Sequence, residues 1–208
     1  MTTKLFPRMK LYPFYSALLA FFLLMHSAQA AIPGLPDKTI RYGLSMGALH
    51  MAVDNPEGLN PDPQSVIPVN FIMTDWLPNG KRYWLDLLFT EAAYAASANQ
   101  MGQNVRYTSL RTLLQKDLKL TNTIRPWIGM GLEFSYTTYG TRYTKASDGF
   151  LLEKFDDRSE FNMGIVFNLT TDWELKNNWF LGMKLEQLFN LENNINARGA
   201  AAYLLYVL

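Results

Sequence analysis

Apolar and polar residues alternate with a period of two along much of this chain. From Ile124 to Thr138 the even-numbered residues are mostly apolar, whereas the odd-numbered ones include Arg125, Gly129 and Glu133. Successive side chains of a strand point to opposite faces, so this pattern predicts a strand with one apolar and one polar face. The segment is longer than a typical globular strand of about 5–6 residues. It exceeds the roughly 9–11 residues with which a tilted strand crosses a bilayer, which favours a membrane-spanning strand.

Further segments of this kind are separated by connections of alternating length. The predicted strands cover 39–53, 66–77, 82–95, 104–119, 123–139, 159–174, 178–190 and 194–208. Tight turns fall at 78–81, 120–122 and 175–177, longer connections at 54–64, 96–103 and 140–158, and a shorter one at 191–193. Outer-membrane barrels have short periplasmic turns and longer extracellular loops. The sequence therefore predicts an all-β fold, an eight-stranded antiparallel up-and-down transmembrane β-barrel.

The period does not say which face of the strands points inward, because a soluble lipocalin-like barrel has an apolar interior. Side-chain volume favours the membrane arrangement. The interior of an eight-stranded barrel is only just wide enough to be filled by side chains, and the large residues of the apolar faces would overfill it. The opposite faces carry glycines such as Gly129, Gly131, Gly164 and Gly182, together with charges of both signs. We therefore expect the apolar faces to contact lipid, and the glycines to leave room in the lumen for something small.

Charged residues on the polar faces are the predicted lumen residues. They are Arg41, Arg82, Asp86, Arg111, Arg125, Glu133, Lys184 and Glu186, with Asp117 and Asp172 as further pairing partners. An unpaired charge in a dry lumen is costly, so we expect ion pairs among them. The five tryptophans lie close to the tight turns. Trp173 and Trp179 have lipid-facing parity, and the other three are predicted to plug the periplasmic end of the lumen.

Residues 1–30 resemble a cleavable signal peptide, which leaves 31–208 as the barrel. Lys4, Arg8 and Lys10 precede an apolar stretch, and Ala28-Gln29-Ala30 is a small-x-small cleavage site. The alternative is a membrane-anchoring helix, but the apolar run is shorter than the ~20 residues that a spanning helix needs. These features predict export and residence in the outer membrane of a Gram-negative cell.

Composition excludes several other classes of protein. Of 19 basic and 18 acidic residues, three bases and no acids lie within 1–30, which leaves 16 basic and 18 acidic residues and a formal charge of −2. No basic stripe indicates nucleic-acid binding, and the chain has no cysteine. We expect no cofactor, no metal site and no catalytic residue. The expected partners are outer-membrane lipid and lipopolysaccharide, and the barrel-assembly machinery during insertion.

Three polar or apolar features outside the lumen allow a second interpretation. His50 is the only histidine after residue 30; it suggests a lipid A-modifying enzyme, but its parity indicates an interfacial histidine on the lipid side. Asp54, Asp156 and Asp157 lie in predicted loops and could bind a cation, although a solvated loop face accounts for Asp156 and Asp157. The apolar residues 150–152 and Phe155 lie in a predicted loop. They either pack against one another or form a lip that receives an apolar ligand or a partner.

Two segments carry a resemblance to a known family. Residues 125–136 are similar to the Pro-aromatic-x-Gly-x-Gly strand of the outer membrane protein W family, and 171–181 to its Asn-x-Trp-aromatic-Leu hairpin; 67–90 match more weakly. The resemblance implies a small eight-stranded barrel that is not an enzyme and lets small hydrophobic molecules pass or bind in a narrow lumen. The alternative is a plugged structural barrel whose extracellular loops bind a partner.

Overall fold

The computed structural model describes residues 40–118, 125–175, 178–191 and 195–207. Lys38–Leu208 forms one compact unit, and the expected signal peptide lies outside the described residues. The strands are β1 (Ile40–Val53), β2 (Gln64–Val66), β3 (Val69–Leu77), β4 (Lys81–Tyr94), β5 (Gly102–Asp117), β6 (Arg125–Lys145), β7 (Leu151–Phe155), β8 (Arg158–Glu174), β9 (Trp179–Asn190) and β10 (Ile195–Val207). Within these ranges no helix is long and apolar enough to cross a membrane.

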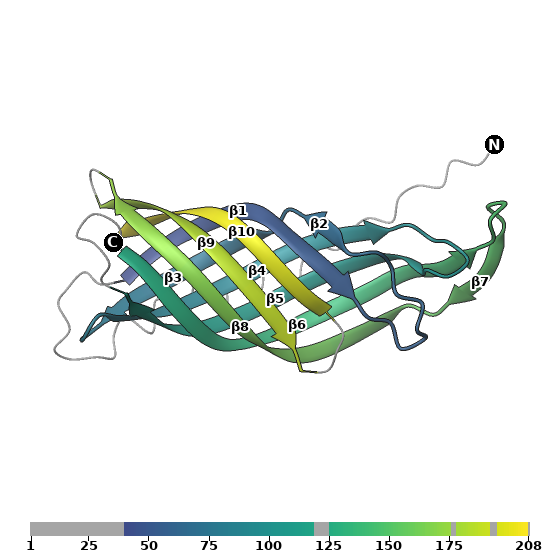
Figure 1. Ribbon diagram of the computed structural model, residues 1–208, viewed down its shortest axis with the longest axis horizontal. Coiled ribbons are helices and arrows are strands. Elements are labelled where there is room, and N and C mark those ends of the chain that lie inside the picture. Colours follow the sequence, from purple (N-terminus) through teal and green to yellow (C-terminus); the bar gives the residue numbers. More distant parts are fainter. Residues whose placement is uncertain (1–39, 119–124, 176–177, 192–194, 208) are drawn as a thin grey trace, which may run out of the picture. The chain divides into compact units, whose positions relative to one another are not determined.

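Eight long strands close into an antiparallel barrel, as predicted. Along the sheet they follow the order β10-β9-β8-β6-β5-β4-β3-β1, and β1 pairs with β10 to complete the cylinder. The closing ladder runs from Arg41 opposite Val207 to Val53 opposite Ile195. Each long strand thus pairs with the next one in the chain, and the strands wrap obliquely around the barrel (Figure 1). Closure satisfies the backbone groups that a sheet edge would leave unpaired in lipid.

The predicted strand 66–77 is divided into β2 and β3. β2 continues the ladder with β1, with Leu49 opposite Val66, and β3 resumes it from Val69 opposite Met46. Pro68 lies between the two strands. Because proline has no N–H to donate to a ladder, it interrupts regular pairing at this point. The interruption lies close to the long loop that precedes β2.

The prediction of a loop over 140–158 is wrong in part. β6 continues to Lys145 and pairs with β7, so most of the connection is a β-hairpin that projects beyond the neighbouring strands (Figure 1). The ladder between β5 and β6 shifts register between Gly102 and Asn104, and Thr141 opposite this shift has a positive φ of 55°. Such a bulge adds a residue to one strand. Beyond it the buried residues of β6 change from odd to even numbers, which turns Arg142 inward.

The tight turn after β3 has the predicted chemistry. Asn79 and Gly80 both have positive φ angles, 65° and 64°. Asparagine and glycine adopt this conformation more readily than other residues. The predicted turn at 120–122 lies outside the described residues, as do 176–177 and 192–193 of the other two short connections.

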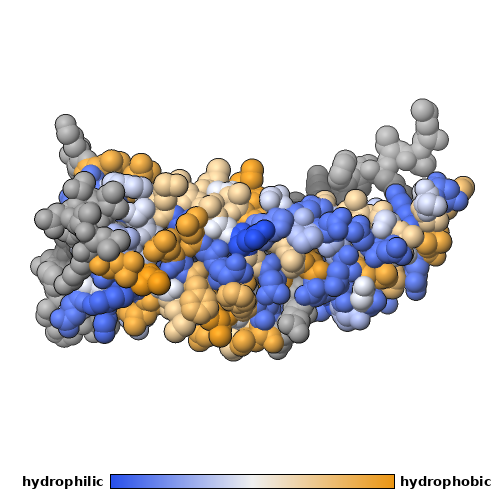
Figure 2. All heavy atoms as spheres, viewed as in Figure 1, coloured by the Kyte–Doolittle hydropathy of each residue, from blue (hydrophilic) through white to orange (hydrophobic). Residues whose placement is uncertain are grey.

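A belt of exposed apolar side chains surrounds the barrel. Figure 2 shows one face of it, with apolar residues gathered over the half that bears the short turns and polar residues towards the β6–β7 hairpin. The belt includes Leu44, Met46, Tyr83, Leu110, Leu114, Ile128, Met130, Leu132, Tyr136, Phe161, Met163, Phe167, Leu169, Trp179, Leu181, Met183, Leu185, Phe189 and Leu204. Soluble proteins rarely expose an apolar surface of this extent. The volume argument is therefore correct, and the lipocalin-like alternative is excluded.

Candidate functional site

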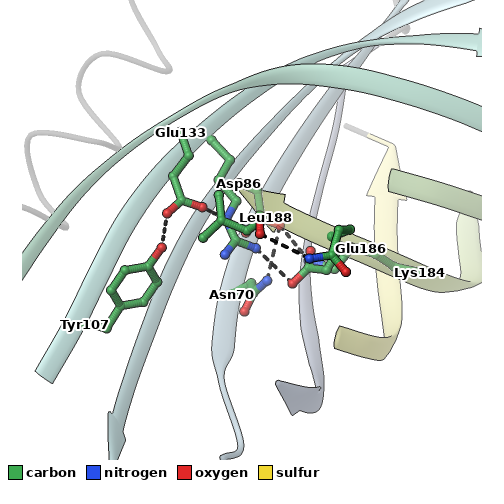
Figure 3. Close-up of polar contacts among 9 residues, drawn as sticks. Asn70, Asp86, Tyr107, Glu133, Lys184, Glu186 and Leu188 are labelled. Carbon is green, nitrogen blue, oxygen red and sulfur yellow. Dashed lines mark hydrogen bonds and ion pairs between the residues drawn. The ribbon is translucent and has the colours of Figure 1, made fainter. Parts of the chain in front are cut away.

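The middle of the lumen contains a buried ionic network (Figure 3). Lys184 of β9 lies 2.6 Å from Asp86 of β4, across the barrel, and 3.0 Å from Glu186 on its own strand. Asn70 donates a hydrogen bond of 3.1 Å to the same oxygen of Asp86. The side chains of Lys184 and Asp86 are each 1% exposed. Charges so far from water require close partners, and the two carboxylates supply them for the ammonium group.

Arg111 of β5 connects the network around Lys184 to Glu133 on β6. It binds Glu133 of β6 at 2.6 Å and Glu186 of β9 at 2.8 Å. Tyr107 donates a hydrogen bond to Glu133 (Figure 3). These contacts link the walls formed by β5, β6 and β9 into one cross-braced layer. We name the set Asp86, Arg111, Glu133, Lys184 and Glu186 the ionic belt; it brings together five of the eight residues that the sequence predicted.

A second layer, towards the short turns, is built around Arg82. This residue is fully buried and forms an ion pair with Asp172. It also donates hydrogen bonds to Gln115 and, at 2.6 Å, to Thr170. Its guanidinium group lies 4.3 Å from the ring centre of Trp127 and 5.1 Å from that of Trp84. Cation–π contacts are strongest where water is excluded, so the two rings stabilise the buried guanidinium group. Together with Arg82 they fill this part of the lumen, and we name the three residues the plug.

The remaining two predicted lumen residues lie at the start of their strands. Arg41 is buried, with its guanidinium 4.0 Å from the ring centre of Trp76 and 4.3 Å from that of Phe180. Arg125 begins β6, but its side chain lies outside the described part of the structure. Trp84 and Trp127 are buried as predicted, whereas Trp179 lies on the lipid side against Tyr206, with 4.9 Å between ring centres.

Sequence reasoning missed several polar members of these layers. Tyr107 and Gln115 share odd parity with Arg111 on β5, so the alternation could have identified them. Tyr203 donates a hydrogen bond to Asp172 and packs edge-on against Trp84, with 5.2 Å between ring centres. The alternation of the final strand is obscured by its alanines, which is why the orientation of Tyr203 could not be predicted.

The inward glycines Gly129 and Gly182 accommodate neighbouring side chains. A Cβ atom at Gly129 would overlap the side chains of Asn168 and Gln115, and one at Gly182 would overlap the ring of Tyr203. The expectation that glycines leave room for a small molecule in the middle of the lumen is therefore wrong. These glycines are needed because large side chains from adjacent strands occupy the space.

The half of the lumen towards the long loops is apolar. It is filled by Leu49, Met51, Val53, Leu88, Ala92, Tyr94, Val105, Leu188, Ile195 and Ala197, each at most 4% exposed. The predicted polar lumen is thus only half of the interior. On β1, β4, β5 and β9 these residues have the same parity as the charged lumen residues of their strand. The sequence alone does not show that apolar residues at these positions lie next to one another in the barrel.

The first and second long loops cover this end of the barrel. Asn55 is buried, accepts a hydrogen bond of 3.2 Å from Gln103 and donates one of 3.0 Å to the carbonyl oxygen of Leu59. The backbone N–H of Met101 also donates to the carbonyl of Leu59, at 3.1 Å. Because both loops are bonded to one another and to β5, they form an ordered cover over the apolar half of the lumen.

Arg142 connects the first loop to the β6–β7 hairpin. It binds Glu57 at 2.7 Å and the carbonyl oxygen of Asp156 at 2.9 Å. Burial alone would raise the pKa of Glu57, but the hydrogen bond and the positive charge of Arg142 outweigh it and lower the pKa below 4.5. The Glu57 carboxylate therefore stays ionised and bonded to Arg142 at neutral pH.

The tip of the β6–β7 hairpin exposes large apolar side chains. Phe150 is 74% exposed, Leu151 61% and Leu152 59%. The interpretation that these residues pack against one another inside a loop is wrong, because the hairpin extends them into solvent. They form an apolar tip that is separated along β6 and β8 from the lipid-facing belt.

The structure places His50 on the outer face of β1 and Asp157 at the base of the β6–β7 hairpin. The Nδ1 atom of His50 lies 3.3 Å from the hydroxyl oxygen of Ser65. Asp157 accepts a hydrogen bond of 2.9 Å from the backbone N–H of Thr141. Across 40–118, 125–175, 178–191 and 195–207, no group of three or more His, Asp or Glu side chains is placed to hold a metal ion.

A closed antiparallel barrel with an apolar outer belt and a charged, side-chain-filled lumen defines the class of this protein. It is an outer-membrane β-barrel protein of the Gram-negative type, because only a closed barrel or a helix satisfies all backbone groups in lipid. Residues 117–199, less than half of the chain, match the family model described as Pom: Protochlamydia outer membrane protein.

Solved structures with the same fold are also small outer-membrane barrels. Neisserial surface protein A is similar with a TM-score of 0.54 and 11% identity, over 79% of this chain and 96% of that protein. Ail, the attachment invasion locus protein of Yersinia pestis, is similar with a TM-score of 0.51 and 10% identity, over 82% and 99%. None of the curated proteins that were compared matches the chain. At these identities the likeness supports the fold only, and membership of the outer membrane protein W family stays a prediction.

Proposed function

We propose that this protein is a plugged interaction barrel: it anchors the β6–β7 hairpin at the cell surface and binds a partner through the apolar tip. The observation that carries the proposal is the pairing of a filled lumen with an exposed tip. A continuous water-filled channel would expose the side chains that line it. Arg82, Arg111, Lys184 and Trp84 are instead at most 2% exposed.

The geometry of the hairpin supports binding at its tip. Its base is fixed by the ladder between β6 and β7, where Arg142 lies opposite Phe155, and by the bonds of Arg142 to Glu57 and Asp156. A binding surface that is held rigid loses less conformational entropy when a partner binds. Large apolar side chains at a solvent-exposed position favour contact with a partner surface. Phe150, Leu151 and Leu152 provide such a surface.

A second candidate is the binding or passage of small hydrophobic molecules, which the resemblance to the outer membrane protein W family implies. The apolar half of the lumen favours it, since Leu49, Met51, Leu88 and Leu188 would contact an apolar solute. The ionic belt opposes passage, because a solute would have to separate buried ion pairs. Covalent chemistry is required by neither candidate, and we propose that the protein is not an enzyme.

The experiment that tests the proposal is site-specific photo-crosslinking on intact cells that produce the full chain. A photoreactive residue at position 152 is compared with one at the exposed loop residue Asn99. We expect a discrete adduct from position 152 only, and its loss when Phe150 and Leu151 are both replaced by serine. The absence of a tip adduct, together with uptake of apolar solutes by proteoliposomes that contain the protein, would favour the second candidate instead.

A further inference from the structure

A cavity of about 460 Å³ opens at the long-loop end of β5, β6 and β8, outside the lumen network. Residues that line it include Asn104, Arg106, Thr138, Gly140, Asp157 and Ser159. The volume lies within the roughly 300–1,000 Å³ of small-molecule pockets. Neither the ionic belt nor the apolar tip contributes to this lining.

Strand register places the polar residues of the cavity on the lipid-facing side. Arg106 lies opposite Thr138, and Thr138 lies opposite Ser159. Arg106 and Ser159 are exposed, and they alternate with buried neighbours such as Tyr107. Two positions further towards the membrane on the same strands, Tyr136 and Phe161 lie opposite each other and are 52% and 67% exposed. A polar pocket thus borders an aromatic part of the apolar belt, which suits an amphiphilic ligand.

The pocket offers both hydrogen-bond donors and acceptors and has little net charge. Each arginine has a carboxylate partner: Arg106 lies 3.4 Å from Glu91, and Arg158 lies 2.9 Å from Glu160. Asp157 supplies a further carboxylate next to the hydroxyls of Thr138 and Ser159. A site for a bare phosphate would need uncompensated cations. Alternating donors and acceptors instead match a polyhydroxylated ligand, whose hydroxyls both donate and accept.

Two further lining residues, Arg158 and Tyr139, form the inner side of the pocket. They have the same parity as the buried residues Asn162 on β8 and Thr137 on β6, and the guanidinium of Arg158 lies 4.3 Å from the ring centre of Tyr139. The groups that face a ligand in the lateral pocket are therefore those of Arg106, Thr138 and Ser159.

We infer that this lateral pocket binds the sugar headgroup of a membrane glycolipid, whose acyl chains lie along Tyr136 and Phe161. A sugar could come from a lipid of the outer leaflet or from a soluble glycan. The pocket lies at the border of the apolar belt that faces the long loops. This position favours the lipid, because only a lipid contacts both the polar pocket and the apolar belt. Binding there would hold the base of the β6–β7 hairpin, since Thr141 and Asp157 belong to both.

Two variants test the pocket in different ways. Arg106→Ala removes a donor. Gly140→Leu fills the cavity: a Cβ atom at Gly140 has its nearest contact with Asp157 Oδ2 at 3.8 Å, so a side chain fits without disturbing the backbone. Arg198→Ala is the matched control, because Arg198 is an exposed arginine of β10 that does not line the cavity. A gel shift between boiled and unboiled samples checks that each full-length variant is folded.

The measurement is the apparent affinity of the barrel in mixed micelles, obtained by native mass spectrometry. The probes are deep-rough lipopolysaccharide, the oligosaccharide released from it by deacylation, and phosphatidylglycerol. We expect Arg106→Ala to weaken lipopolysaccharide binding by about tenfold or more, the effect of losing one or two hydrogen bonds to a charged group. Gly140→Leu should weaken it by a similar factor, because its side chain would occupy the pocket. Arg198→Ala should change the affinity less than twofold.

The other probes identify the source of the sugar. Intact lipopolysaccharide should bind at least about tenfold more tightly than its oligosaccharide, because the acyl chains add apolar contact. Equal binding of both would indicate a soluble glycan and overturn the assignment to a lipid. Unchanged affinity in both pocket variants, or equal binding of phosphatidylglycerol to the unaltered chain, would overturn the site itself.

Discussion

Replacement of Lys184 by methionine tests whether the ionic belt is as dry and tightly paired as its geometry indicates. Methionine keeps most of the side-chain length but removes the ammonium group that lies 2.6 Å from Asp86 and 3.0 Å from Glu186. Glu186 keeps Arg111 at 2.8 Å, whereas Asp86 keeps only the amide of Asn70 at 3.1 Å. The variant therefore leaves one buried carboxylate without a cation. Breaking a buried pair in this way costs about 3–5 kcal/mol.

The assay is reversible urea unfolding in lipid vesicles, followed by tryptophan fluorescence. Lys184→Met should lower the free energy of unfolding by about 3–5 kcal/mol, which is a factor of roughly 10²–10³·⁵ in the equilibrium constant. The matched control is Lys81→Met, because Lys81 is an exposed lysine at the start of β4; surface changes of this kind stay within about 0.5 kcal/mol.

A double variant separates the loss of pairing from the loss of the lysine itself. Adding Asp86→Asn to Lys184→Met removes the orphaned charge, so the double variant should be more stable than the single one by about 1 kcal/mol or more. A loss below about 1 kcal/mol in Lys184→Met, or a double variant no more stable than the single one, would show that Asp86 does not depend on Lys184 for its charge. Either result would mean that water reaches the ionic belt and hydrates Asp86.

Three further predictions concern the plug, the glycine packing and the loop cover. Trp84→Ala should lower the free energy of unfolding by about 3–5 kcal/mol in the same urea assay, because Trp84 is fully buried against Arg82 and Tyr203. Gly182→Leu should prevent folding, seen as loss of the boiled-versus-unboiled gel shift, since its side chain would occupy the position of the Tyr203 ring. Gly140→Leu should fold, because the nearest atom to its Cβ atom is Asp157 Oδ2 at 3.8 Å, an ordinary van der Waals contact. The pKa of Glu57 is lower in the folded protein than its usual 4.5, so its contribution to stability is complete above about pH 4.5 and is lost as the pH falls through the lowered pKa; the NMR signal of the neighbouring Gly58 amide should shift in that acidic range and should not do so in Glu57→Gln.

The barrel could be predicted from the sequence because the alternation is carried by residues whose burial differs strongly. In β6, β8 and β9 large apolar residues alternate with glycine and charged residues, and each pairing follows from the order of the strands. The charges at Asp86, Arg111, Glu133, Lys184 and Glu186 could likewise be assigned to the lumen from parity. Their partners could not, because pairing across the barrel depends on strand tilt and on how far each strand is staggered against the next.

The structure differs from the prediction where a bulge or a change of residue type interrupts the alternation of apolar and polar residues. At the bulge near Thr141 the inward-facing residues of β6 change from odd to even numbers, and no residue type in the sequence indicates this change. The change is the reason that Arg142 points inward to Glu57. The apolar half of the lumen was hidden because Leu49 and Leu88 lie on faces that are polar elsewhere. Neither the cover formed by Asn55 and Gln103 nor the exposure of Phe150 could follow from local pattern, since both depend on the path of long connections.

Single-channel recording in planar bilayers shows whether the lumen is closed. The full chain, shown to be folded by its gel shift, is compared with an Arg82→Ser/Trp84→Ala variant in which the plug beside the ionic belt is removed. We predict no steps of ionic current for the unaltered barrel, because Arg82, Trp84, Arg111 and Lys184 close its cross-section. Steady conductance of the unaltered barrel, at a level that the variant does not exceed, would mean that the lumen is open.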